Sequence, residues 1–143
     1  MDSTDLRILD LLRADGRLSK ADIGRAVGLT PAAIIERLRK LETSGVIRGY
    51  HAEVDHAALG LGILVYVFVL DNDPSRRRET GDRLAAIAGV EEVAKITGED
   101  TFLVKVRVAD TESLARLLED DFGSIETIAS TRTSLVLETV RDS

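Results

Sequence analysis

The pattern of apolar and polar positions divides the chain into two parts. Up to about residue 45, apolar residues recur at intervals of three and four, which is the spacing along one face of an α-helix. From residue 61, runs rich in β-branched and aromatic residues alternate with charged amphipathic stretches, which predicts strands and helices in turn. We therefore expect two domains, residues 1–50 and 61–143, joined by a linker strand at 51–60.

The first part is predicted to hold three short helices, over about residues 5–14, 19–27 and 31–44. Gly16 is expected to cap the first helix in a left-handed conformation, and Ser19 to cap the start of the second. Gly28 permits the positive φ of a tight turn, and Thr30 and Pro31 suit the start of the third helix. Two short helices joined by such a turn are typical of a helix-turn-helix.

In a helix-turn-helix the second helix of the pair enters the major groove of DNA. Arg37 is predicted to read guanine through its forked donors, while Arg39 and Lys40 are expected at phosphates. Glu36 either accepts a hydrogen bond from cytosine or forms an ion pair with Lys40. Two alanines at the start of the helix allow close approach. The predicted DNA-contacting residues are Ser19, Lys20, Thr30, Ala32, Ala33, Glu36, Arg37, Arg39, Lys40 and Arg48.

The segment after Gly45 alternates loosely and is rich in β-formers, so residues 46–54 are predicted to form a small wing or connecting strand. Strands are then expected at 61–70, 90–97, 101–108 and 125–140. Helices are expected at 75–88, with Leu84, Ala85, Ile87 and Ala88 facing inward, and from Asp110. The order βαββαβ predicts a ferredoxin-like sheet with both helices on one face, and an α+β fold for the whole chain.

Both faces of the first of these strands are apolar. Val65, Val67 and Val69 alternate with Tyr66 and Phe68, whereas a sheet covered by helices on one side usually has a polar second face. We expect a second copy of the chain to cover the open face in a homodimer, and the alternative is that the first domain folds over it.

Composition narrows the possible functions. Residues 1–60 hold nine basic and nine acidic residues, and residues 61–143 hold ten and 16, so any DNA affinity must come from a local basic cluster. The chain has no cysteine, and His51 and His56 alone do not make a zinc site, so no metal or cofactor is expected. Without an apolar span or signal sequence, the chain is expected to be cytoplasmic. The sequence contains no nucleophile–base pair and no phosphate-binding loop, so no enzyme activity is expected.

Several stretches together resemble the Lrp/AsnC (feast/famine) family of transcriptional regulators over nearly the whole chain. They are residues 5–9, 27–31, 37–42, 45–50, 97–98 and 131–133. The resemblance implies a winged helix-turn-helix, which binds double-stranded DNA, joined to a ferredoxin-like effector domain. It also implies dimers, higher oligomers such as octamers, and an amino acid or related small molecule as effector. The alternative is a small-molecule-sensing regulatory subunit that does not bind DNA.

The resemblance places the effector near the loop from Thr97 to Phe102. Gly98 gives close backbone access, turn N–H groups suit a carboxylate, and Glu99 or Asp100 suits an ammonium group. The family often has Asp where this chain has Thr101, and the loop can also be an ordinary hairpin turn. The predicted effector-binding residues are Thr97, Gly98, Glu99, Asp100, Thr101, Phe102, Thr131 and Thr133.

Overall fold

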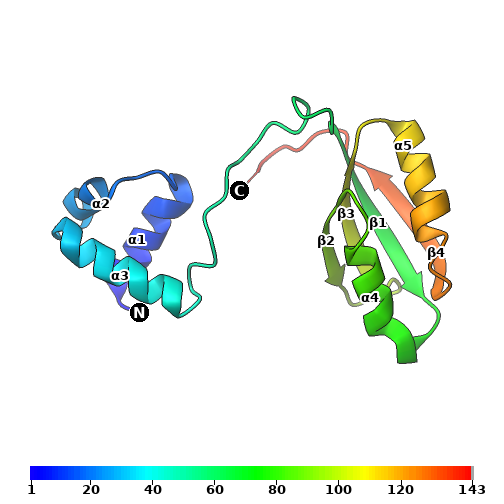
Figure 1. Ribbon diagram of the computed structural model, residues 1–143, viewed down its shortest axis with the longest axis horizontal. Helices are drawn as coiled ribbons and strands as arrows, with labels where there is room; N and C mark the ends of the chain where they lie inside the picture. Colours follow the sequence, from blue (N-terminus) through cyan, green and yellow to red (C-terminus); the bar gives the residue numbers. More distant parts are fainter. Residues whose placement is uncertain (143) are drawn as a thin grey trace. The chain divides into compact units, whose positions relative to one another are not determined.

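The structure, a computed structural model, describes residues 1–142. The chain forms two compact units, Met1–Glu53 and Val54–Ser143, and each is described by itself below (Figure 1). None of the helices among the described residues has the length and apolar character that crossing a membrane requires.

The first unit consists of three helices, α1 (Ser3–Ala14), α2 (Lys20–Val27) and α3 (Pro31–Thr43), as predicted. Their core contains Ile8 from α1, Ile23 from α2, and Ile34 and Leu38 from α3. Each helix turns its apolar stripe inward, so the opposite face of α3 is left for solvent or a partner.

The ends of α1 differ from the prediction. The helix begins two residues earlier because Asp2 caps it: the Asp2 carboxylate accepts from the backbone N–H of Asp5, and the Asp5 carboxylate accepts from that of Asp2. This reciprocal pair is a capping box. The prediction that Gly16 is a left-handed cap was wrong, because Asp15 ends the helix in an extended conformation and Gly16 has no positive φ.

The caps of α2 and α3 and the turn between these helices follow the predicted chemistry. Ser19 accepts from the N–H of Asp22, Gly28 adopts a φ of 76°, and Thr30 accepts from the N–H of Ala33. The turn also lies very close to Gly24, where a Cβ atom would stand 2.4 Å from the carbonyl oxygen of Leu29. α2 and the turn therefore approach each other at a distance that only glycine permits at position 24.

The prediction of a wing at 46–54 and of a linker strand at 51–60 was wrong. Residues 46–60 contain no strand, and a turn occupies 56–60. Ile47 donates its backbone N–H to Leu41, and the hydroxyl of Tyr50 donates to Glu42, so this segment is tied to α3 instead of to another strand. β-propensity depends on a neighbouring strand, and none pairs with this segment in the described part of the chain.

The second unit is the predicted βαββαβ arrangement. Its elements are β1 (Ile63–Asp71), a 3-10 turn η1 (Pro74–Arg76), α4 (Arg77–Ala85), β2 (Val90–Lys95), β3 (Phe102–Val108), α5 (Thr111–Arg116), a π-helical turn η2 (Leu117–Phe122) and β4 (Ile128–Leu135). The strands lie in the order β2-β3-β1-β4, and neighbouring strands are antiparallel. β4 is shorter than predicted.

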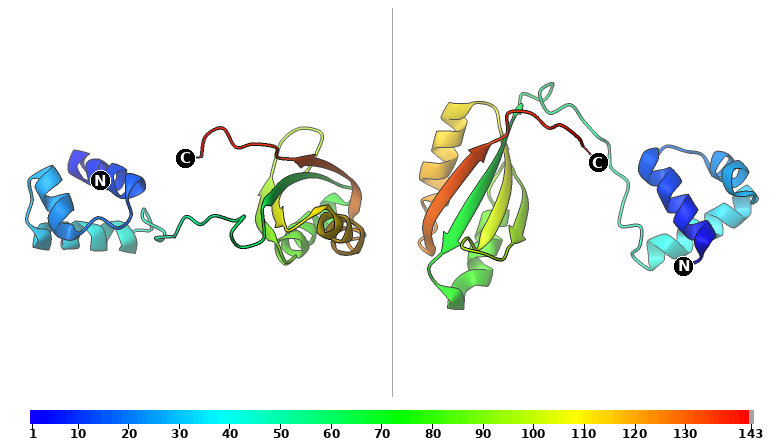
Figure 2. Two further views of the ribbon diagram at one scale, coloured as in Figure 1. Left: turned by 90° about the horizontal axis from the view of Figure 1, so that it is seen from above. Right: turned by 180° about the vertical axis from the view of Figure 1, so that it is seen from behind.

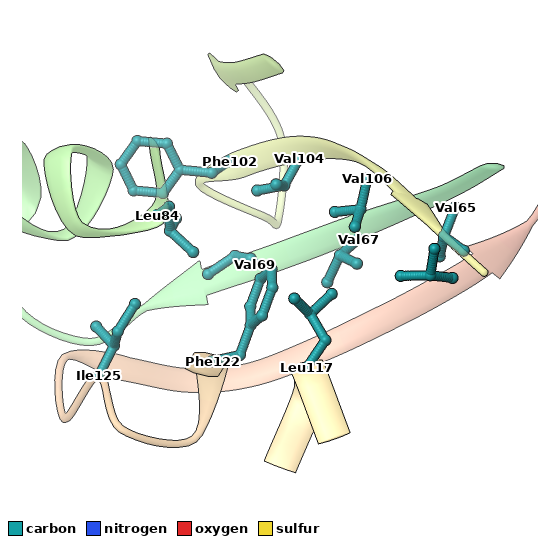
Figure 3. Packing of buried hydrophobic residues seen from close by; sticks show 11 residues of the cluster. Val65, Val67, Val69, Leu84, Phe102, Val104, Val106, Leu117, Phe122 and Ile125 are labelled. Carbon is teal, nitrogen blue, oxygen red and sulfur yellow. The ribbon is translucent and has the colours of Figure 1, made fainter. Parts of the chain in front are cut away.

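Both helices cover the same face of the sheet, as the views in Figures 1 and 2 agree. Figure 3 shows the core that they enclose, with Val67 and Val69 of β1 beside Leu117 and Phe122. Leu84 of α4 is fully buried, whereas Ala85 and Ala88, predicted to point inward, are exposed. The α4 helix thus contacts the sheet through a narrower face than its sequence indicated.

Among the described residues of this unit, no helix or strand covers the opposite face of the sheet, and the centre of that face is apolar. Tyr66 and Phe68 of β1 are only half-buried there, and Leu70 is exposed. Leu103 of β3 pairs with Phe68 and so lies on the same face. On the same face Tyr66 pairs with Lys105 and Ser134, and Phe68 pairs with Arg132, so polar side chains border this apolar strip. An exposed apolar strip rimmed by polar residues marks a site of interaction.

Candidate functional site

The candidate DNA interface is the outward face of α3. Ala32, Glu36, Arg39 and Lys40 are exposed, and Ala33 is half-buried. A hollow of about 730 Å³ separates this face from the start of α1. The sequence prediction did not name Ile35, which lies on the same helix and is 54% exposed. Only its departure from the inward spacing of three and four signalled an outward position.

Two cap residues of the predicted set already use part of their hydrogen-bonding capacity. Ser19 and Thr30 each accept a backbone N–H with the hydroxyl oxygen. The hydroxyl hydrogen of each remains available to donate, and each marks a helix N-terminus that suits a phosphate. Lys20 and Arg48 are exposed, but Arg48 lines a groove against α1 and lies outside α3.

Arg37 does not point freely into solvent. Its Nη1 donates to both carboxylate oxygens of Asp2, at 2.8 and 3.0 Å, and to Asp5 at 2.9 Å, and its side chain is 30% exposed. Arg37, the predicted guanine reader, therefore forms an ion pair that links α3 to the start of α1. The hydrogen bonds that Arg37 donates to Asp2 and Asp5 raise the pKa of Arg37.

The same ion pair perturbs Asp2. The hydrogen bond from Arg37, assisted by the backbone N–H of Asp5, lowers the pKa of Asp2 from 3.8 to about 2. A carboxyl whose pKa is lower in the folded state than in the unfolded state stabilises the fold at pH values above its ordinary pKa. For Asp2 this contribution is lost as the pH falls from about 4 to about 2.

We expect a carbon-13 NMR titration to give Asp2 a midpoint of about 2 in the wild-type chain. In Arg37→Gln the midpoint should rise toward the ordinary value, because the largest cause of the shift is removed. Asp110, which caps α5 in the second unit, serves as the internal reference. An Asp2 midpoint unchanged by the substitution would contradict the ion pair.

The remaining cations of α3 are paired within the helix. Arg39 donates to Glu36 through two nitrogens, at 2.7 and 3.1 Å, and Lys40 lies 3.9 Å from the same carboxylate. The bond from Arg39 lowers the pKa of Glu36. Exposed pairs of this kind are weak, so Arg39 and Lys40 can exchange Glu36 for a phosphate at little cost.

The predicted effector residues do not form one cluster. Thr101 is buried, where its Oγ1 accepts the backbone N–H of Asp71, and Phe102 is part of the core. The N–H of Ile96 donates to Thr101 and closes the turn between β2 and β3, where Gly98 has a φ of 110° and Thr97 and Glu99 are exposed. Thr101 and Phe102 therefore hold the turn in place.

Asp100 faces a residue that the predicted set omitted. Its carboxylate accepts from Arg132 at 2.8 Å, and the Arg132 guanidinium lies 4.2 Å above the ring of Phe68. Thr131 and Thr133 flank Arg132 on β4, but they pair with Val69 and Val67 and so belong to the other face of the sheet. The predicted site is thus divided between the two faces.

Two family models match the chain. The AsnC-type helix-turn-helix domain matches residues 1–42, and the Lrp/AsnC ligand binding domain matches residues 63–143. The chain belongs to the Lrp/AsnC family. Its members are transcriptional regulators and not enzymes, so this chain is a DNA-binding transcriptional regulator with a ligand-binding domain.

Curated relatives and solved structures agree with this assignment. The chain is 34% identical over 141 residues to the regulator LrpA of Mycobacterium tuberculosis. The matched region covers 97% of this chain and 91% of the relative. It is 32% identical to the leucine-responsive regulatory protein of Haemophilus influenzae, over 99% of this chain and 86% of the relative.

Among solved structures, the complex of a Neisseria meningitidis transcriptional regulator with L-Met superposes with a TM-score of 0.94 at 25% identity, covering 99% of this chain and 93% of that one. The M. tuberculosis LrpA structure superposes with a TM-score of 0.85 at 30% identity, covering 99% and 96%. The similarity spans both units of this chain.

Proposed function

We propose that this Lrp/AsnC regulator binds specific operator sequences in double-stranded DNA through the outward face of α3. The observation that carries the proposal is the capped turn at Gly28–Thr30, which presents exposed Arg39, Lys40 and Ala32 on one helix. The small side chain of Ala32 allows the helix close to thymine methyl groups, and the two cations suit phosphates. A regulator acting on DNA in this way is expected in the cytoplasm.

We expect Arg39→Ala and Lys40→Ala each to weaken operator binding and to reduce the slope of affinity against salt concentration by about one. Electrophoretic shift or fluorescence anisotropy across a salt series measures both effects. Arg116→Ala, on exposed α5, is the matched control. Absence of any salt-dependent DNA binding by the wild-type chain would favour the alternative, a sensing subunit that does not bind DNA.

The homodimer is proposed to form through the open face of the sheet. Its support is the uncovered apolar centre around Tyr66, Phe68 and Leu103. A self-complementary patch makes a two-fold dimer, which would pair two α3 helices for a near-palindromic operator. Assembly of dimers into a larger oligomer such as an octamer belongs to the same proposal.

The effector is proposed to be an amino acid that binds near the turn from Thr97 to Phe102. Its supports are the match to the ligand binding domain, the L-Met complex of the Neisseria relative and the ion pair of Asp100 with Arg132. Asp100 suits an ammonium and Arg132 a carboxylate. Thermal unfolding in the presence of each of the twenty amino acids tests this, because a ligand that binds only the folded state raises the Tm.

A further inference from the structure

A cavity of about 450 Å³ lies between α4 and the edge strand β2 of the second unit. Arg77 and Arg78 line it from α4, and Lys95 lines it from β2. Val93 and Phe102 supply apolar surface, and Asp82 is the one acidic residue of its lining. The cavity therefore combines three positive charges and one negative charge with an apolar wall.

The fold accounts for this grouping. Residues 78, 82 and 85 of α4 recur at helical spacing, so they face the same side. Lys95 pairs with Phe102 across the sheet, which places its side chain on the face that the helices cover. Gly81 keeps the helix close to the sheet without filling the space, because a Cβ there would stand 3.3 Å from the Phe102 ring.

The three cations have no acidic partner. Within residues 1–142, no salt bridge includes Arg77, Arg78 or Lys95, whereas nearby Arg76 and Arg83 both pair with Glu126. The Nε atom of Arg77 is buried and has no hydrogen-bond partner among the described residues. A buried donor without an acceptor is costly, and native proteins rarely keep one without a reason.

We propose that this cavity binds a small oxyanion of net negative charge, a carboxylate or a phosphate compound. Arg77, Arg78 and Lys95 donate hydrogen bonds to the oxyanion, and Phe102 and Val93 contact its apolar part. The lining charge favours a dianion over a zwitterionic amino acid. The site differs from the effector site proposed at the β2–β3 turn, because Phe102 is the one residue of that set that lines this cavity.

The test uses the full chain with three probes at fixed ionic strength: inorganic phosphate, succinate and leucine. NMR spectra of the arginine Nε–Hε groups report directly on Arg77. We expect phosphate or succinate to shift the Arg77 resonance and to raise the Tm. The anion that binds more tightly shows whether the cavity prefers a phosphate or a carboxylate. Arg77→Gln and Lys95→Gln should each weaken that binding roughly tenfold or more, since a charge-assisted hydrogen bond is lost.

Arg116→Gln removes the same charge from α5, outside the cavity, and should leave anion binding unchanged. Amide spectra of each variant establish that it is folded. The proposal is overturned if neither anion shifts the Arg77 resonance, or if Arg77→Gln binds the anion as tightly as the wild-type chain. Leucine binding in this cavity as tightly as succinate also overturns it, because the charge argument would then fail.

Discussion

Replacing Phe68 by Lys should convert the proposed dimer into a monomer. Phe68 lies at the centre of the open sheet face, between Leu103 on β3 and Arg132 on β4. Burying a phenylalanine contributes about 2 kcal/mol, and a two-fold interface contains it twice. The loss of about 4 kcal/mol corresponds to roughly a thousandfold weaker dimer, before the cost of placing an ammonium beside Arg132 is added.

Analytical ultracentrifugation across a concentration series measures this effect. Phe68→Leu is the matched control, because it keeps the surface apolar and should remain dimeric. The monomer formed by Phe68→Lys should retain its near-native circular dichroism, since the side chain lies on the face opposite to the core. A Phe68→Lys chain that dimerises at wild-type concentrations would rule out this face as the interface.

Operator affinity should fall together with the dimer. A single α3 carries three cations and two anions, and its charge is largely neutralised because Arg37 is bound to Asp2 and Arg39 to Glu36. One copy is therefore expected to bind DNA weakly, and two linked copies gain from effective concentration. Binding of the monomeric variant at wild-type affinity would show that pairing of the α3 helices contributes nothing.

Local signals were sufficient to predict most of the fold from the sequence. Ser19, Gly28 and Thr30 predicted the caps and the turn correctly, because each cap bond joins residues three apart and the turn needs only the positive φ of Gly28. The strand at 46–54 was predicted wrongly because β-structure needs a partner strand, and pairing is not encoded locally. Asp2 was missed as a cap, although Asp is a favoured N-cap residue and an Asp also stands three residues after the Ser19 cap of α2.

The candidate sites were harder to predict, because which residues pair across elements depends on tertiary structure. Arg37 has the sequence position of a base reader, but its ion pair spans more than 30 residues of sequence. Thr101 and Phe102 stand in the expected loop, yet one bonds Asp71 and the other is in the core. Arg132 was passed over between two threonines, although it is the residue that contacts Asp100.

Gly24→Ala should strongly destabilise the first unit, although alanine normally favours a helix. An exposed helical position would gain up to about 1 kcal/mol from this change. At position 24 the new Cβ would lie 2.4 Å from the carbonyl oxygen of Leu29, a backbone atom that cannot rotate away. Relieving such an overlap requires α2 and the turn to separate, at a cost on the order of 3 kcal/mol.

That cost is large for a unit of this size. A domain of about 50 residues is stable by about 3–8 kcal/mol, so the substitution removes a large part of the total. Hydrogen exchange should therefore speed up in α2 and α3 while β1 and β3 keep their protection, and operator binding should fall in parallel. Gly16→Ala is the control, because its Cβ would meet nothing closer than 3.8 Å. If both variants exchanged like the wild-type chain, the close contact between α2 and the turn would not be what requires glycine at position 24.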